Sequence, residues 1–167
     1  MGKKAVFIDR DNTIAIDVPY CDKPEKFHLF KGVGEAIKKL NDAGFLVIII
    51  TNQSGVARGY FTETTLEKIH KKMKEDLAKN NAHVDAVYYC PHHPNEGCEC
   101  RKPGTELIKK AVKDFDILLN KSYVIGDRLH DVELAKKIGC VAIRIDNYTD
   151  KYISFNEAVN LILKGKV

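Results

Sequence analysis

Short apolar runs and amphipathic segments alternate along the chain, and this alternation limits the possible folds more than any other feature. The run 45–52, FLVIIITN, is apolar and rich in β-branched residues, which is typical of a strand buried on both faces of a sheet. The segment before it, 32–44, repeats apolar residues at helical spacing and closes on glycine. The same order recurs, with strands expected at 3–11, 45–52, 84–90, 122–127 and 140–145 and helices at 32–44, 62–80, 104–115, 129–138 and 155–165. The sequence therefore predicts an α/β fold, a three-layer, Rossmann-like parallel sheet with helices on both faces.

Size and charge narrow the class of protein. With 167 residues and 44% hydrophobic residues, the chain suits a single domain, expected over 1–167. Its net charge of +4 comes from 27 basic and 23 acidic residues, without the aromatic-interleaved basic tract that grips nucleic acid. The sequence shows no secretory signal and no apolar run of the ~20 residues that a membrane span needs, and its five cysteines cannot all pair. We expect a monomeric, cytoplasmic protein with a small anionic ligand and no nucleic-acid or membrane partner.

Polar residues with chemical functions follow the predicted strands. They are Asp9 and Asp11 at the end of the first strand, Thr51 and Asn52 at the end of the second, Arg101 and Lys102 on the loop after the third, and Asp127 at the end of the fourth. Each taken alone also suits a solvated turn or a helix cap, but the carboxyl ends of parallel strands meet at one crevice. Carboxylates there suit Mg²⁺, which commonly binds one or two carboxylates together with substrate phosphate oxygens. The sequence therefore predicts a phosphoryl-transfer site.

A second group of candidate ligands lies in the segment 90–103, CPHHPNEGCECRKP. The ligand types of a closed tetrahedral zinc site occur here as Cys90, His92, Cys98 and Cys100. His93 is an alternative to His92, and a disulfide is an alternative to the metal, although it would leave the histidine without a role. We expect a structural Zn²⁺ in a small loop at about 90–100, which fixes the basic residues that follow it.

Four motifs resemble those of a known superfamily. They are DRDNT (9–13), TNQSG (51–55), RKP (101–103) and GDRLHD (126–131), and in this order they resemble the motifs of the haloacid dehalogenase superfamily of phosphatases. The segment 51–63, TNQSGVARGYFTE, more closely resembles the D-glycero-D-manno-heptose 1,7-bisphosphate phosphatase family, which is related to the histidinol-phosphatase domain. Asn12 stands where these relatives usually have glycine. Because asparagine tolerates unusual backbone angles, we expect the turn to survive.

The resemblance implies catalytic roles for Asp9, Asp11, Thr51 and Lys102. Asp9 would attack phosphorus and form an aspartyl-phosphate, and Asp11 would protonate the leaving alkoxide and then deprotonate the attacking water. Thr51 and Lys102 would hold the phosphoryl oxygens. Mg²⁺ would be bound by Asp9, the backbone carbonyl of Asp11 and Asp127, while Asp131 would orient Lys102 or a metal-bound water.

Substrate contacts are expected around the crevice from Asp17, Tyr20, Asn52, Gln53, Ser54, Arg58, Arg101 and Arg128. No large cap domain is expected, because only the zinc loop and the segment 20–26 are available to cover the crevice. The resemblance implies a sugar phosphate as substrate, D-glycero-D-manno-heptose 1,7-bisphosphate. A histidinol-phosphate phosphatase, a phosphatase of nucleic-acid ends and a phosphate-binding module without turnover stay open as alternatives. The pair Asp9 and Asp11 argues against the last, since binding alone needs no nucleophile with an acid beside it.

Overall fold

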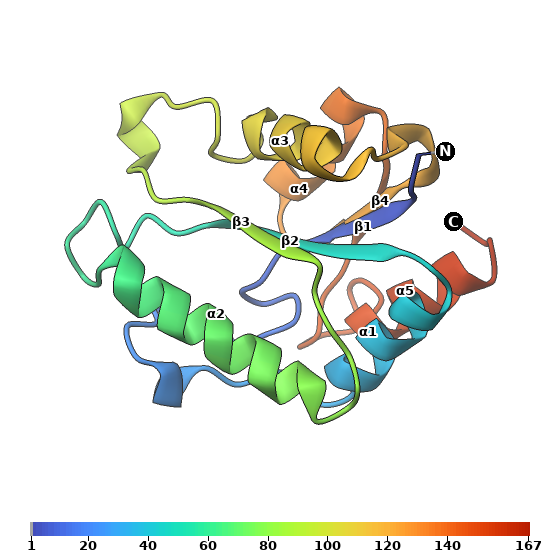
Figure 1. Ribbon diagram of the computed structural model, residues 1–167, viewed down its shortest axis with the longest axis horizontal. Coiled ribbons are helices and arrows are strands. Elements are labelled where there is room, and N and C mark those ends of the chain that lie inside the picture. The colour runs from blue at the N-terminus through green and yellow to red at the C-terminus, as the bar shows by residue number, and fades with distance from the viewer. Residues whose placement is uncertain (1) are drawn as a thin grey trace.

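The computed structural model describes residues 2–167, and its centre is a five-stranded parallel sheet (Figure 1). The strand order is β3-β2-β1-β4-β5, with β1 at Ala5–Ile8, β2 at Leu46–Asn52, β3 at Ala86–Cys90, β4 at Tyr123–Gly126 and β5 at Val141–Arg144. Phe7 of β1 pairs with Ile48 of β2 on one side and with Val124 of β4 on the other. The predicted parallel α/β fold is confirmed, as are its five strands, although the first ends at Ile8 and leaves Asp9 and Asp11 on the segment that follows it.

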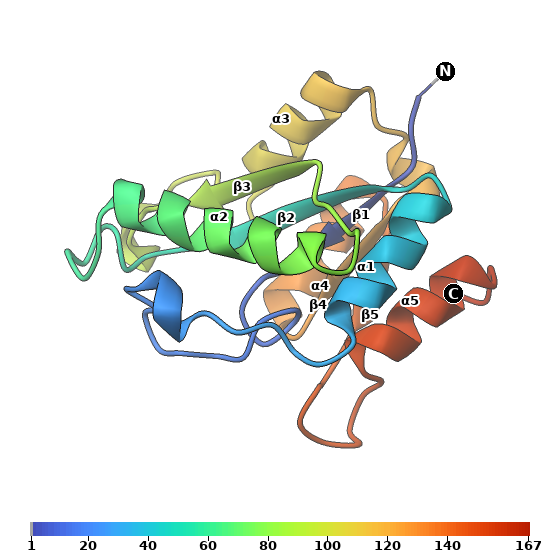
Figure 2. The same ribbon diagram turned by 60° about the horizontal axis from the view of Figure 1, so that its bottom comes forward.

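Helices cover both faces of this sheet. Within residues 2–167 they are α1 (Val33–Asp42), α2 (Glu63–Ala78), α3 (Glu106–Phe115), α4 (Leu129–Ile138) and α5 (Phe155–Leu163). In Figure 1, α3 and α4 lie above the sheet and the other three lie below it, and Figure 2 shows α1 beside α5. The third helix begins at Glu106, slightly later than expected, because the N–H of Gly104 closes a turn on the carbonyl of Arg101. None of the helices in residues 2–167 combines the length and the apolar character needed to cross a membrane.

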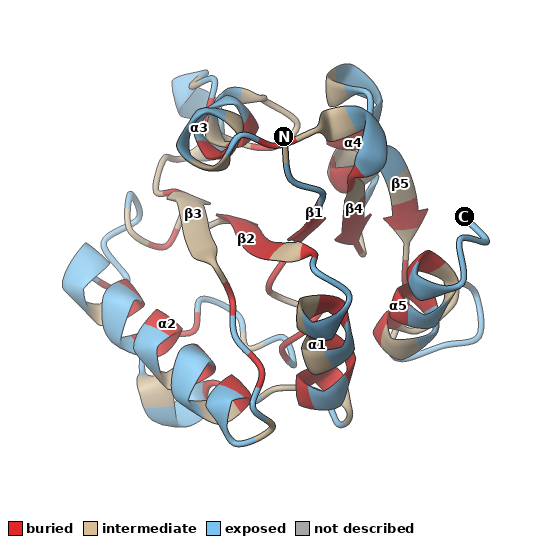
Figure 3. Ribbon diagram, turned by 45° about the vertical axis from the view of Figure 1, so that its right-hand side comes forward, coloured by how far each residue is buried: buried red, intermediate tan, exposed pale blue. Residues whose placement is uncertain are grey.

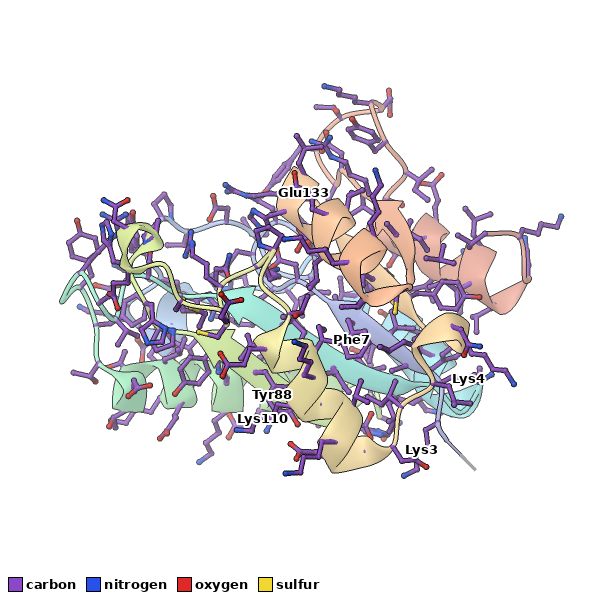
Figure 4. The ribbon with its side chains drawn as sticks, turned by 90° about the horizontal axis from the view of Figure 1, so that it is seen from above. Lys3, Lys4, Phe7, Tyr88, Lys110 and Glu133 are labelled. Atoms are coloured by element: carbon purple, nitrogen blue, oxygen red, sulfur yellow. The ribbon has the colours of Figure 1, made fainter. Side chains whose placement is uncertain are left out.

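Alternate residues of the inner strands feed two apolar cores. In β1, Val6 and Ile8 pack in the core below the sheet, while Ala5 and Phe7 pack in the core above it. Figure 3 shows this burial along the inner strands and the inward helix faces, and Figure 4 shows Phe7 and Tyr88 on the side that α3 covers. Because side chains are buried on both faces of β1 and β2, the ends of these strands have fixed positions.

The order of the strands places a crevice between β1 and β4. From β1 the chain builds β2 and β3 on one side of the sheet, and then returns to build β4 and β5 on the other. The N–H of Asp9, just after β1, donates to the carbonyl of Ile125 in β4 at 3.0 Å. Such a reversal of strand order opens a crevice outside the carboxyl ends of the strands. The segments 9–30, 52–62 and 90–104 gather at this end, on the left of Figure 1.

Candidate active site

A cavity of about 260 Å³ opens at these strand ends. Most of the predicted site residues line it, namely Asp9, Asp11, Asp17, Tyr20, Thr51, Asn52, Gln53, Ser54, Arg101 and Arg128. Two further predicted residues lie against Asp9. Lys102 donates a hydrogen bond to it, and a carboxylate oxygen of Asp127 lies within 4.8 Å of one of its own. Arg58 stands over the ring of Tyr20, with its guanidinium carbon 5.6 Å from the ring centre. The fold thus brings together residues from four separate loops.

Lys102 joins two of the predicted motifs. Its Nζ donates to Oδ1 of Asp9 and to Oδ1 of Asp131, both at 2.7 Å, and its side chain is 2% exposed. Burial alone would lower the pKa of Lys102, but the two carboxylates outweigh burial and raise this pKa above its ordinary value. Lys102 is therefore a fixed positive charge beside Asp9. The other oxygen of Asp131 accepts the backbone N–H of Arg128 at 3.2 Å, so Asp131 is engaged on both sides.

Asp127 has the properties of a cation ligand. It lies near Asp9, because oxygens of Asp9, Asp127 and Asp131 all fall within 4.8 Å of one another. Burial and the charge of Asp9 raise the pKa of Asp127 to about 7, and its Oδ1 is buried without a hydrogen-bond partner among the described residues. Such an oxygen needs a partner, and Mg²⁺, which prefers carboxylate oxygens, fits it. Since Asp131 is already engaged, Asp9 and Asp127 are the carboxylates best placed for the ion.

Arg10 and Gln53 hold the carboxylate of Asp11. Nε and Nη2 of Arg10 donate to Oδ1 and Oδ2 of Asp11, each at 3.0 Å. Gln53 donates to Oδ2 at 2.9 Å and, with the same nitrogen, to the hydroxyl of Thr51 at 2.8 Å. The side chain of Asp11 is 31% exposed, so it keeps access to the cavity. Each aspartate of the first motif therefore has its own cation, Lys102 for Asp9 and Arg10 for Asp11.

Two residues predicted to contact substrate are bonded to the protein in this structure. Nδ2 of Asn52 donates to the carbonyl of Lys102 at 3.3 Å, and Oδ1 of Asn52 accepts the N–H of Lys102 at 3.0 Å. Gln53 bonds to Asp11 and Thr51, as described above. Both amides thus connect the end of β2 to other parts of the site. Sequence alone could not show this, because an amide beside a crevice suits either role.

Basic side chains flank the mouth of the cavity. Nη1 of Arg101 is buried without a hydrogen-bond partner in residues 2–167, while the side chain of Arg128 is 61% exposed and reaches to 3.7 Å from Asp127. His130 also lines the cavity, and its pKa is lowered to about 4 by burial and by the charge of Lys102, so its imidazole is neutral. Neither His130 nor Arg10 was predicted as a site residue from the sequence. The available signal was their place inside the quoted motifs DRDNT and GDRLHD.

Tyr20 takes an unusual backbone conformation at the mouth. Its φ of 50° lies in the left-handed region, where a bulky residue is uncommon. Its ring packs edge-on against Tyr60, with the ring centres 4.7 Å apart. The segment after β1 is thereby joined to the segment after β2 at the rim. Asn12 is likewise left-handed, with φ at 61°, which confirms the expectation that asparagine can form this turn.

The predicted zinc ligands converge. Nδ1 of His92 lies 3.1 Å from Sγ of Cys100 and 3.5 Å from Sγ of Cys90, and the Cys98 sulfur lies 3.5 Å from that of Cys90. His93 instead accepts the N–H of Asn95 at 3.2 Å, so His92 is the histidine of the cluster. The cysteines within residues 2–167 are free thiols, and the disulfide alternative is not formed. Three sulfur atoms and one imidazole nitrogen this close fit a single tetrahedral metal ion.

Comparisons with known proteins agree with this site. A family model described as Polynucleotide kinase 3 phosphatase matches residues 4–160. The D-glycero-beta-D-manno-heptose-1,7-bisphosphate 7-phosphatase of Haemophilus ducreyi is 42% identical over 146 residues, covering 83% of this chain and 80% of that protein. The protein of the same name from Escherichia coli is 38% identical over 138 residues, covering 78% of this chain and 72% of its own.

A solved structure extends the similarity to nearly the whole chain. The crystal structure of D,D-heptose 1,7-bisphosphate phosphatase from B. bronchiseptica, complexed with magnesium and phosphate, has a TM-score of 0.87 and 29% sequence identity. The match covers 97% of this chain and 99% of that one. This chain therefore belongs to the haloacid dehalogenase superfamily of phosphatases, in the family that contains the D-glycero-D-manno-heptose 1,7-bisphosphate phosphatases.

Proposed function

We propose that this chain is a magnesium-dependent phosphatase that hydrolyses a sugar phosphate, D-glycero-D-manno-heptose 1,7-bisphosphate, through an aspartyl-phosphate. The observation that carries the proposal is the separate cation on each motif aspartate in one cavity, Lys102 on Asp9 and Arg10 on Asp11. The two cations hold the carboxylates in separate, fixed positions, which both an attack on phosphorus and a proton transfer at the leaving oxygen require. The relatives named as heptose bisphosphate phosphatases support the choice of substrate.

The reaction proceeds in two displacements at phosphorus. A carboxylate oxygen of Asp9 bonds to phosphorus while the ester bond to the sugar oxygen breaks, and the carboxyl of Asp11 gives its proton to that oxygen. A water then attacks the phosphorus of the aspartyl-phosphate, Asp11 takes a proton from this water, and the bond to Asp9 breaks. Lys102 keeps Asp9 in one orientation throughout, and Thr51 donates to a phosphoryl oxygen. Phosphate leaves, and both aspartates return to their starting states.

Asp9, Asp127 and the backbone carbonyl of Asp11 would hold the Mg²⁺. When bound, the ion supplies positive charge that offsets the repulsion between the nucleophilic carboxylate and the phosphate. The unpartnered, buried Oδ1 of Asp127 supports this assignment. Asp131 serves the site by holding Lys102 rather than the ion.

The cluster of Cys90, His92, Cys98 and Cys100 would hold a structural Zn²⁺. All four ligand positions come from the protein, so the ion has no position for substrate. Arg101 and Lys102 follow the last ligand directly, and the ion would fix the loop that carries them. We further propose that the enzyme works as a monomeric single domain in the cytoplasm, a reducing compartment that suits a metal site with three cysteine ligands.

Arg101 is the residue we assign to the second phosphate of the substrate. Its buried, unpartnered Nη1 leaves a donor available to an anion, and guanidinium groups suit phosphate oxygens. We predict that Arg101→Ala raises KM for the sugar bisphosphate about tenfold or more, because a hydrogen bond to a charged group contributes ~1.5–3 kcal/mol. KM for the matching monophosphate should change little. Steady-state kinetics on both sugars checks this, with Lys102→Met as the comparison variant, which should impair both sugars alike. An equal rise in KM for both sugars in Arg101→Ala would show that Arg101 does not bind the second phosphate.

A phosphatase of nucleic-acid ends is the second candidate. The description of the matching family model, Polynucleotide kinase 3 phosphatase, favours it. Turnover of the heptose bisphosphate, of histidinol phosphate and of a DNA oligonucleotide with a terminal 3′-phosphate should be measured under the same conditions. We expect kcat/KM to be highest for the bisphosphate. A higher kcat/KM for the oligonucleotide would show that the substrate is a nucleic-acid end and not a sugar phosphate, with the same chemistry at the site.

A further inference from the structure

Arg10 is a buried cation with partners on two sides. It is 1% exposed and is among the largest fully buried side chains of the protein. One edge of its guanidinium forms the two-bond fork on Asp11, and on the other edge Nη1 lies 3.2 Å from Nε2 of His70. The ring of Phe27 lies 5.9 Å from the guanidinium carbon. A buried guanidinium is costly unless its donors are satisfied, so these contacts restrict it to one orientation.

His70 reaches this site from a distant element. It lies within α2, 60 residues along the chain from Arg10, and is 6% exposed. Burial, followed by the charges of Arg10 and Lys74, lowers the pKa of His70 to about 3, so the imidazole is neutral near neutral pH. A neutral ring has one nitrogen that accepts a hydrogen bond, and the contact with Arg10 requires that this nitrogen is Nε2. The two-step mechanism gives His70 no other task.

We propose that Arg10 and His70 are positioning residues for the proton transfers of Asp11. The inference rests on the proposed function, in which Asp11 is the acid and base. The Arg10 fork holds both oxygens of a side chain that is otherwise open to the cavity, and His70 holds the guanidinium against rotation. General acid–base catalysis requires the donor within hydrogen-bond reach of the reacting oxygen, and a misplacement of ~1 Å can cost about a hundredfold.

Esters with different leaving groups distinguish a loss of Asp11 positioning from general damage to the active site. A sugar alkoxide needs a proton as it departs, whereas 4-nitrophenolate leaves without one. For Arg10→Gln we expect kcat on the sugar phosphate to fall about a hundredfold. On 4-nitrophenyl phosphate, a rapid burst of nitrophenolate should persist, followed by slow turnover, because the second step still needs Asp11 as base. A burst reduced as much as the sugar reaction, or kinetics equal to wild type on both esters, would overturn the proposal.

Two substitutions of His70 test whether this residue positions Arg10, and neither of them removes a charge. His70→Gln keeps an acceptor for Arg10, and His70→Phe removes it. We expect His70→Phe to reproduce the pattern of Arg10→Gln more weakly and His70→Gln to restore most of the activity on the sugar phosphate. The matched control is His83→Phe, at a histidine whose side chain is 63% exposed, and it should behave as wild type. Equal activity of the two His70 variants would show that His70 does not position Arg10.

Asp11→Asn distinguishes failure of this inference from failure of the proposed function. If Asp11→Asn shows the preserved burst and slow turnover but Arg10→Gln does not, only the positioning role is wrong. If Asp11→Asn hydrolyses both esters as wild type does, the proposed role of Asp11 is wrong, and the role of Arg10 falls with it.

Discussion

Asp9 and Asp11 share one cavity because each carboxylate contacts a different buried cation. Lys102 bonds Asp9 and is held in turn by Asp131, while Arg10 bonds Asp11 and is held by His70. Two carboxylates in one cavity repel each other, and the two cations offset this repulsion. The difference between the two cations also gives the two aspartates different surroundings, which suits different roles in catalysis.

His70 should make the stability of the protein depend on acid. Its pKa is lowered from an ordinary 6.5 to about 3 in the folded protein, chiefly by burial. Below pH 6.5, His70 is therefore protonated in the unfolded chain and stays neutral in the folded protein. The free energy of unfolding falls with acid by at most about 1.4 kcal/mol per pH unit, down to about pH 3.

Urea denaturation between pH 7 and pH 4 measures this effect. In His70→Gln the titrating group is gone while an acceptor for Arg10 remains. The free energy of unfolding should then fall less steeply with acid than in the wild type. Identical slopes for the two proteins would show that His70 does not titrate with a lowered pKa.

Contacts between residues far apart in the sequence were the part of the site that could be predicted least. The motif residues Asp9, Lys102 and Asp127 were expected at strand ends, and the fold places them together. The contact between Arg10 and His70 depends on how α2 packs against the turn after β1, and neither residue has a pattern that reveals it. His70 lies beside Ile69 on the buried stripe of α2, where a histidine reads as an ordinary core residue.

The loop from Cys90 to Lys102 connects the cluster of three cysteines and His92 to the cavity. Cys90 ends β3, and the last cluster ligand, Cys100, stands two residues before Lys102. From the other side, the amide of Asn52 at the end of β2 bonds the backbone of Lys102. The lysine beside the nucleophile is therefore positioned by two elements at once.

Loss of the proposed zinc should loosen this loop and leave the sheet intact. We predict that Cys98→Ser lowers zinc content, speeds amide hydrogen exchange across 91–102 and reduces kcat/KM, because structural zinc contributes folding energy directly. Cys140→Ser is the matched control, since Cys140 lies outside the cluster. Metal analysis, hydrogen exchange and kinetics, all with Mg²⁺ present, make the comparison. Wild-type protein purified without chelator that contains no zinc would contradict the assignment.

The architecture of the whole chain could be predicted from the sequence because the inner strands β1 and β2 are buried on both faces. The apolar run of β2 and the alternation with helices leave few arrangements other than a covered parallel sheet. The strand order was not predicted, since the same elements can be wound in several orders. That order matters for function, because it places β1 beside β4 and so brings Asp9 near Asp127.

In the proposed mechanism, Asp9 becomes phosphorylated during turnover. The stereochemical course at phosphorus tests this step, measured with a thiophosphate ester whose phosphorus carries two different oxygen isotopes and which is hydrolysed in water enriched in the third isotope, so that the thiophosphate released is chiral. Two successive in-line displacements, first by Asp9 and then by water, predict overall retention of configuration, and Asp9→Asn should abolish the reaction. Inversion of configuration would mean that water attacks the substrate directly, and it would contradict the account.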